Sequence, residues 1–209
     1  MFGIHDFALF VIAGVLLNLT PGPDTLYVVT RSAGHGLRAG LIAALGIGSG
    51  CFVHIFAAAI GLSALIAASA IAFNVVRWLG AAYLIYLGVS LLRSRPVVPR
   101  PAVVAKEPLA DGRVYAQGFL TNALNPKVAL FFVAFLPQFI APAATHKTLA
   151  FLLLGLVFNV NGTLWLLLVA VMTATVAGRA TRLASLRVWR DRGIGLLFVA
   201  LGVRLAWQR

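Results

Sequence analysis

Two short polar stretches interrupt the apolar sequence of this 209-residue chain, and each combines proline with an ionisable residue. Residues 18–24 read NLTPGPD, and residues 122–127 read NALNPK. A regular helix does not pass through either stretch unaltered, because proline removes a backbone donor. Asp24 is the only acidic residue within an apolar segment of the chain. Since a charged group inside a membrane is costly, Asp24 and Lys127 indicate a functional site.

Each break is expected to begin a half-helix, whose free amide groups carry about half a unit of positive charge. Lys127 lies in the first turn of the second half-helix and opposes this charge, so it needs an anion nearby, either Asp24 or a bound substrate. Two alternatives stay open. Asp24 also fits an ordinary helix start that Thr20 caps, and Lys127 also fits a side chain that extends to the membrane surface.

Opposite charges and free amide ends at the two breaks predict a pocket for a small zwitterion, such as an amino acid. The amide ends and Lys127 would bind its anionic end, and Asp24 with several asparagines would bind its ammonium group. The predicted substrate-binding residues are Asn18, Thr20, Pro21, Gly22, Pro23, Asp24, Asn122, Asn125, Pro126, Lys127, Asn159 and Asn161. Asp24 and His54 are the candidates for carrying a coupling proton, although His54 also fits a hydrogen-bonded packing residue.

The elements that would position these residues are membrane spans, because 61% of the chain is hydrophobic and only 11% is charged. A soluble domain of this length is far more polar. Most of the apolar segments approach the roughly 20 residues that a span requires. The six segments are residues 7–29, 39–66, 75–92, 115–140, 149–177 and 193–207. The sixth is the shortest and contains Arg204. The first lacks the basic leader of a removable signal peptide.

The net charge of +12 comes mainly from arginines between the apolar segments. This positive-inside pattern places loops 93–114 and 179–192, and the connection that carries Arg31 and Arg38, in the cytoplasm, with both termini outside. Binding of these arginines to lipid head groups is the alternative. A nucleic-acid partner is not expected. Cys51 is the only cysteine, so no disulfide, thiol relay or cysteine metal cluster forms within one chain.

The two breaks also occupy corresponding places in the two halves of the chain. Glycine precedes asparagine by four residues at Gly14 and Asn18, and again at Gly118 and Asn122. Because three apolar segments separate the copies, the second half would enter the membrane from the opposite face, as in the inverted repeats of many secondary transporters. A chance likeness between two apolar helices is the alternative.

The sequence therefore predicts an all-α polytopic membrane protein with six transmembrane helices, arranged as two inverted three-helix repeats in which the first and fourth helices are broken. The repeats would be residues 1–92 and 115–209, joined by a cytoplasmic basic linker at residues 93–114. The second segment is rich in small residues, which let helix backbones approach closely in a membrane. These residues include Gly40, Ala43, Ala44, Gly46, Gly48 and Gly50.

The chain resembles the LysE/RhtB family of bacterial amino-acid exporters from end to end. The motifs that carry the resemblance are TPGP at residues 20–23, GAAYLIYLG at residues 80–88 and NALNPK at residues 122–127. The resemblance implies a small inner-membrane translocator that the proton gradient energises and that is oligomeric. It is closer to the homoserine/threonine-type branch than to the branch for basic amino acids. Because the family varies just after the first motif, the resemblance gives Asp24 a role in substrate choice.

Three other functions compete with amino-acid export. A transporter of metal or inorganic ions would use the same scaffold, but one intramembrane carboxylate and no cysteine cluster are poor ligands for a divalent ion. A membrane-embedded enzyme would need a nucleophile with a base, or paired carboxylates, which Asp24 and His54 do not provide. A purely structural membrane subunit would need no broken helices. No cofactor or metal is expected, and the expected partners are an amino acid, membrane lipid and further copies of the chain.

Overall fold

The computed structural model describes residues 2–62, 64, 70–93, 110–176, 192–193, 195–196, 198–200, 202–203 and 207. This described part is helical and contains no strand, as predicted; a single isolated bridge joins Ile4 to Ile140. The elements are α1 (Phe7–Leu19), α2 (Pro23–Ala57), the π-helix η1 (Ala58–Leu62), α4 (Ala70–Leu92), α5 (Asp111–Ala123), α6 (Pro126–Leu130), the π-helix η2 (Phe131–Phe135), the 3₁₀-helix η3 (Leu136–Phe139) and α7 (Lys147–Val176).

Both breaks predicted from the prolines are present. The chain leaves α1 after Leu19, is extended at Thr20 and Gly22, and begins α2 at Pro23. It leaves α5 after Ala123 and begins α6 at Pro126, and the axis bends by 41° between α5 and the helical residues that follow. Proline is well suited to these first helical positions, because the amide it lacks would have no partner within the helix.

The structure has a further interruption, a turn at Gly36, that was not predicted. Gly36, inside α2, has φ 83° and ψ −177°, a backbone conformation that residues other than glycine rarely adopt. A Cβ added at Gly40 would overlap the Ser32 hydroxyl, so the chain folds back on itself at this point. Residues 23–35 and 37–57 are therefore two helices. The expected connection around Arg31 and Arg38 is shorter than predicted, because Arg31 lies within the first of these helices.

Close contact between α2 and α5 confirms the packing predicted from the small residues. A Cβ added at Gly46 or Gly50 would meet backbone atoms of α5, and one added at Gly118 would lie 2.7 Å from the Ala43 carbonyl oxygen. The two backbones are thus too close for any larger residue at these positions. Such contact holds helices together where lipid and protein are equally apolar.

The Gly118→Ala variant is expected to lose about 1–3 kcal/mol of unfolding free energy, because the added methyl group would push α5 away from α2. Gly112→Ala is the matched control on the same helix, since a Cβ there meets nothing within 4 Å. The control is expected to change stability by at most about 0.5 kcal/mol. Thermal unfolding of both purified proteins in detergent, followed by circular dichroism, measures the difference. Equal stability of the two variants would contradict the close α2–α5 packing.

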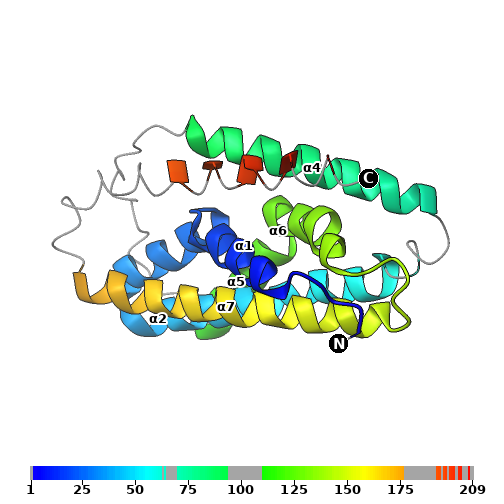
Figure 1. Ribbon diagram of the computed structural model, residues 1–209. Helices are drawn as coiled ribbons and strands as arrows, with labels where there is room; N and C mark the ends of the chain where they lie inside the picture. Colours follow the sequence, from blue (N-terminus) through cyan, green and yellow to red (C-terminus); the bar gives the residue numbers. More distant parts are fainter. Residues whose placement is uncertain are drawn as a thin grey trace.

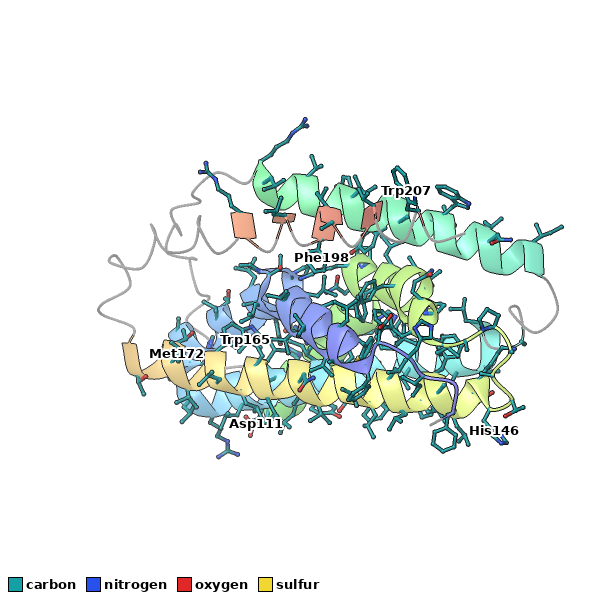
Figure 2. The ribbon with its side chains drawn as sticks, viewed as in Figure 1. Asp111, His146, Trp165, Met172, Phe198 and Trp207 are labelled. Atoms are coloured by element: carbon teal, nitrogen blue, oxygen red, sulfur yellow. The ribbon has the colours of Figure 1, made fainter. Side chains whose placement is uncertain are left out.

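Figure 1 shows how the layers are arranged: α2, α5 and α7 lie on one side, α4 and the described C-terminal residues lie on the other, and α1 and α6 lie between them. Gly80 of α4 contacts the backbone at Ala134, and Gly88 contacts Gly195 and Val199. Phe198 is fully buried between the layers, whereas Trp207 is 83% exposed (Figure 2).

An aromatic cluster fixes the second break against the first helix. Phe131 of η2 stacks on Phe158 of α7 with ring centroids 4.5 Å apart, and Phe10 of α1 packs edge-on against Phe139 at 5.2 Å. The π-helix adds a residue to its turn, which rotates successive phenylalanines into the core. These rings pack the helical residues that follow the second break against α1 and α7.

The outer face of α7 is apolar along its whole length. Its exposed large residues recur every three or four positions and form one stripe. They are Leu149, Leu153, Leu156, Val160, Leu164, Leu168, Val171 and Met172. Lipid covers such a stripe in a membrane protein. By length and composition, two helical stretches in the described part could span a membrane: Pro23–Leu62, which includes the turn at Gly36, and Lys147–Thr175. The bent pair of Asp111–Ala123 with Pro126–Phe139 makes a third if it counts as one span.

Parts of the predicted topology fall outside the described residues. Most of loops 93–114 and 179–192 lie there, and so does part of the sixth predicted segment, 193–207. The residues of this segment that are described are helical. Gly202 contacts Ala81 and Ile85 of α4. The six-span count and the inverted repeat remain predictions.

Candidate functional site

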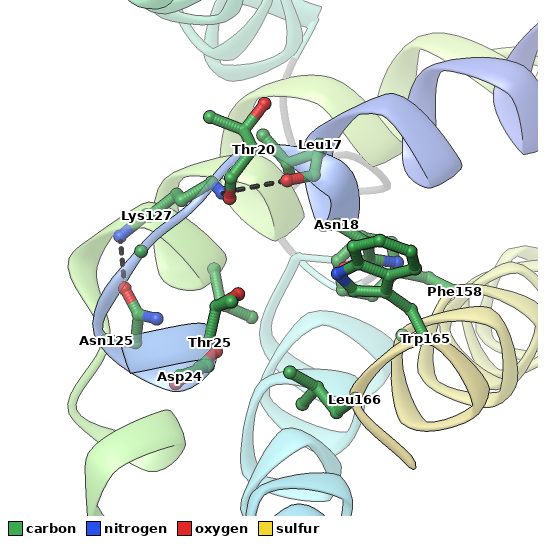
Figure 3. A pocket seen from close by; sticks show the side chains of 13 residues that line it. Leu17, Asn18, Thr20, Asp24, Thr25, Asn125, Lys127, Phe158, Trp165 and Leu166 are labelled. Atoms are coloured by element: carbon green, nitrogen blue, oxygen red, sulfur yellow. Dashed lines mark hydrogen bonds between the residues drawn. The ribbon is translucent and has the colours of Figure 1, made fainter. Parts of the chain in front are cut away.

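Lys127 joins the two breaks. Its ammonium Nζ donates hydrogen bonds to the carbonyl oxygens of Leu17, at 2.8 Å, and Thr20, at 2.7 Å (Figure 3). These carbonyls are at the end of α1, where a helix leaves its last acceptors without partners and carries partial negative charge. The compensating group for Lys127 is therefore the end of α1. Neither oxygen of Asp24 lies within 4.0 Å of Nζ, although the two charges interact electrostatically.

The residues around Lys127 shape this contact. The Asn125 side chain caps α6 by accepting a hydrogen bond from the Lys127 backbone amide at 3.0 Å. Thr20 donates its hydroxyl to the Leu16 carbonyl at 2.9 Å, so it ends α1 and does not cap α2. Gly22 has φ −148°, an extended conformation that any residue adopts. A Cβ there would lie 3.6 Å from the Lys127 side chain, an ordinary van der Waals contact, so neither conformation nor space requires glycine at this position.

Asp24 lies in the first turn of α2 and faces α5. Its Oδ2 accepts a hydrogen bond from Asn122 Nδ2 at 2.8 Å. Behind this pair, His54 Nε2 donates to the Asn122 backbone carbonyl at 2.9 Å, since a carbonyl oxygen only accepts. The His54 ring also packs on Phe132, with centroids 5.9 Å apart. Asn122 thus connects His54 to Asp24 and holds one oxygen of the carboxylate in place.

A cavity of about 30 Å³ lies between the breaks and α7 (Figure 3). The side chains that line it from α7 are apolar except for the indole N–H, whereas the two breaks contribute most of the polar ones. The polar lining consists of Asn18, Thr20, Asp24, Thr25, Asn125 and Lys127, with Gly22 and Gly162. The remaining lining residues are apolar or aromatic: Leu17, Val128, Phe158, Trp165 and Leu166. A water needs about 10–15 Å³ by this measure, so the cavity is large enough for water and too small for an amino acid.

Three buried polar atoms of this lining have no hydrogen-bond partner in the protein. They are two donors, Asn18 Nδ2 and Trp165 Nε1, and one acceptor, Asp24 Oδ1. A buried polar group without a partner costs about 1–3 kcal/mol. The cavity therefore offers donors and an acceptor to a ligand that brings both kinds of group.

The structure brings half of the predicted substrate-binding residues to the cavity. Asn18, Thr20, Gly22, Asp24, Asn125 and Lys127 line it. Asn122 lies behind Asp24, and Pro23 and Pro126 begin the helices. Pro21 is not part of the lining, and neither are Asn159 and Asn161. Asn159 is buried and accepts a hydrogen bond from Thr163 within α7 at 3.3 Å.

The apolar half of the lining was not predicted. Phe158, Trp165 and Leu166 look like ordinary residues of an apolar span, and only Gly162 interrupts their side of α7. The sequence feature that could have pointed to them is their position close to the polar residues of the same apolar segment. Within the described residues, no group of three or more His, Cys, Asp or Glu side chains is placed to hold a metal ion.

Comparison with known proteins identifies the family. The family model described as LysE type translocator matches residues 15–209. A protein of Pseudomonas aeruginosa described as an uncharacterized membrane protein is 34% identical over 207 residues, covering 98% of this chain and 96% of the relative. Leucine efflux proteins of Enterobacter sp. and Salmonella typhimurium are 33% and 30% identical over 205 residues, covering 98% of this chain and 97% and 96% of theirs. No solved structure matches. The chain is a multi-pass membrane protein that belongs to the LysE family of translocators.

Proposed function

We propose that this protein exports an amino acid, or a similar small zwitterion, across the bacterial inner membrane as a secondary transporter. One observation carries the proposal: both broken helices line a single closed cavity with Asp24 and Lys127 in its polar half. Half-helices that meet at a central site are typical of secondary transporters. The names of the leucine efflux relatives support an amino-acid cargo, and leucine is the first cargo to test.

The charges around the cavity fit a zwitterion. Lys127 Nζ already binds two carbonyl oxygens, so its charge is partly balanced before any ligand arrives. Asp24 keeps Oδ1 without a partner, and this oxygen would accept a hydrogen bond from the ammonium group of the cargo. The orphaned donors of the cavity would receive the carboxylate.

Export by this route requires the cavity to open. At about 30 Å³ it is closed around the site, and alternating access would widen it first toward one face of the membrane and then toward the other. In the proposed topology, halves 1–92 and 115–209 form inverted repeats of three spans that rock about the breaks. Loops 93–114 and 179–192 lie in the cytoplasm, and both termini lie outside. We propose further that the proton gradient drives export and that the protein forms homo-oligomers.

Flux measurements in proteoliposomes test the function. Vesicles with purified protein and labelled L-leucine are given an imposed pH gradient, and leucine movement is compared with protein-free vesicles. We expect leucine flux that responds to the pH gradient. Labelled L-lysine under the same conditions is expected to show no such flux. No flux of any amino acid above that of empty vesicles would overturn the proposal.

Of the two candidates for proton coupling, Asp24 faces the cavity and His54 is bound to the Asn122 carbonyl. We propose that Asp24 carries the proton and that His54 positions Asn122. The His54→Gln variant, which keeps a donor, is therefore expected to retain gradient-driven leucine flux to within about threefold, the effect of a change of about 0.7 kcal/mol. A variant that still exchanges leucine across the membrane but no longer responds to the pH gradient would make His54 the proton carrier.

A further inference from the structure

One face of α7 closes the cavity opposite the two breaks. Phe158, Gly162, Trp165 and Leu166 all line it, and their spacing of four, three and one residues puts them on one side of the helix. Figure 3 shows Phe158, Trp165 and Leu166 on the side away from Asn125 and Lys127. None of these four residues is a charged or amide side chain, so α7 faces the polar half of the cavity with a different chemistry.

Two donors in the cavity lining, one of them on this face, have no hydrogen-bond partner. Trp165 Nε1 and Asn18 Nδ2 are buried, and both residues line the same cavity. Gly162 lies beside the Asn18 amide, and a Cβ there would be 3.2 Å from its nitrogen and oxygen. Glycine therefore leaves the amide accessible from the cavity. These two unpartnered donors fit a carboxylate, which accepts through both of its oxygens.

The other side chains on this side of the cavity are apolar and buried. Phe158 is 4% exposed and Leu166 6% exposed. Among the described residues that line the cavity, Asp24 and Lys127 are the two with ionisable side chains. One of them is needed for the cargo's ammonium group, and the other is occupied by α1. A charged cargo side chain would find no partner, whereas an apolar one would find this wall.

Building on the proposed function, we infer that α7 determines the substrate: Trp165 Nε1 and Asn18 Nδ2 bind the carboxylate, while Phe158 and Leu166 receive an apolar side chain. The cargo is then a neutral amino acid with an apolar side chain, held with its ammonium group at Asp24. Phe158 and Leu166 would then determine specificity, whereas Trp165 would bind a group common to all amino acids.

Two changes test the carboxylate contact: one removes the Trp165 donor from the protein, and the other removes the carboxylate from the ligand. The Trp165→Phe variant keeps an aromatic ring and loses the Nε1 donor. It is expected to bind L-leucine about tenfold more weakly than the wild type in calorimetry on purified protein, as a lost hydrogen bond to a charged group implies. Binding of 3-methylbutylamine, which is leucine without its carboxylate, is expected to change less than about twofold. Trp207→Phe, at an exposed position, is the control and is expected to bind both ligands normally.

The result that would overturn the carboxylate assignment is an equal loss of affinity for both ligands in Trp165→Phe, since the indole would then act through packing alone. A wild-type protein that binds neither ligand would instead reject the proposed function. Normal folding of each variant is checked by its thermal unfolding.

Competition with other amino acids tests the apolar wall. Unlabelled valine, methionine and phenylalanine are expected to compete with labelled leucine for binding. Lysine and glutamate are not expected to compete, even at tenfold higher concentration. Leu166→Ala removes methyl groups from the wall and is expected to shift the phenylalanine-to-leucine affinity ratio upward by about tenfold, as a pocket difference of a few carbon atoms does. Strong competition by lysine, or an unchanged ratio in Leu166→Ala, would contradict an apolar side-chain pocket on α7.

Discussion

The Asp24→Asn variant is expected to export leucine about a hundredfold more slowly than the wild type. Asparagine has nearly the same shape, so the cavity keeps its size, but the negative charge opposite the cargo's ammonium group is lost. Removing one member of a buried charge pair costs about 3–5 kcal/mol, and about 3 kcal/mol corresponds to a hundredfold change. Initial rates of leucine flux in proteoliposomes measure the effect.

Asp111→Asn is the control for this change. Asp111 begins α5 and pairs with Arg38 at 2.6 Å, but it lies away from the cavity and is half exposed. An exposed ion pair contributes about 0–1 kcal/mol, so export by this variant is expected to stay within about fivefold of the wild type. Leucine export by Asp24→Asn at the rate of Asp111→Asn would mean that Asp24 does not bind the ammonium group.

The second large effect is expected at Lys127, and it is an effect on stability as well as on transport. Lys127→Met keeps the length of the side chain and leaves the carbonyl oxygens of Leu17 and Thr20 without their donor. Hydrogen bonds from a charged donor contribute about 1.5–3 kcal/mol each, so the unfolding free energy is expected to fall by about 3 kcal/mol. Leucine export is expected to be lost, because the end of α1 no longer stays at the start of α6. Thermal unfolding and flux are measured on the same preparation.

Lys147→Met, in the first turn of α7, is the matched control, and little change in either property is expected. One result would contradict the role assigned to Lys127. If Lys127→Met unfolds like the wild type and only its affinity for leucine falls, then Lys127 is a substrate ligand and not the group that joins the two breaks.

The breaks were predictable because their cause is local. Pro23 and Pro126 lack the amide that an unbroken helix needs, and the sequence states this directly. The partner of Lys127 was not predictable, because the carbonyls at the end of α1 are 107 and 110 residues away in sequence. Asp24 and a substrate were the only compensating groups that the sequence displayed, while backbone carbonyls are present at every position.

Two other features were hidden for a similar reason. The turn at Gly36 lies among residues that favour helix on both sides, and a single glycine does not show that the chain folds back there. Trp165 looks like a lipid-facing or packing residue, and only the fold places its Nε1 beside Asn18 in a shared cavity.

The arrangement also explains how two modest breaks produce one site. Lys127, in the first turn of α6, binds the carbonyl oxygens at the end of α1, so these two helix ends attract each other without help from Asp24. Asp24 is then free to keep one oxygen for the cargo while Asn122 holds the other. The charge that builds the site and the charge that binds the ligand are therefore different residues.

Protection of a cavity cysteine by leucine tests this account most directly. In a Cys51→Ala background, which removes the only native cysteine, Thr25→Cys places a thiol in the cavity and Thr175→Cys places one at the exposed end of α7. The rate of modification by a small methanethiosulfonate reagent is measured with and without saturating L-leucine. We expect leucine to slow modification at position 25 by about tenfold or more, as an occupied site does, and to leave position 175 unchanged. Equal rates at position 25 with and without leucine, in a protein that still transports leucine, would show that the cargo does not bind between the two breaks.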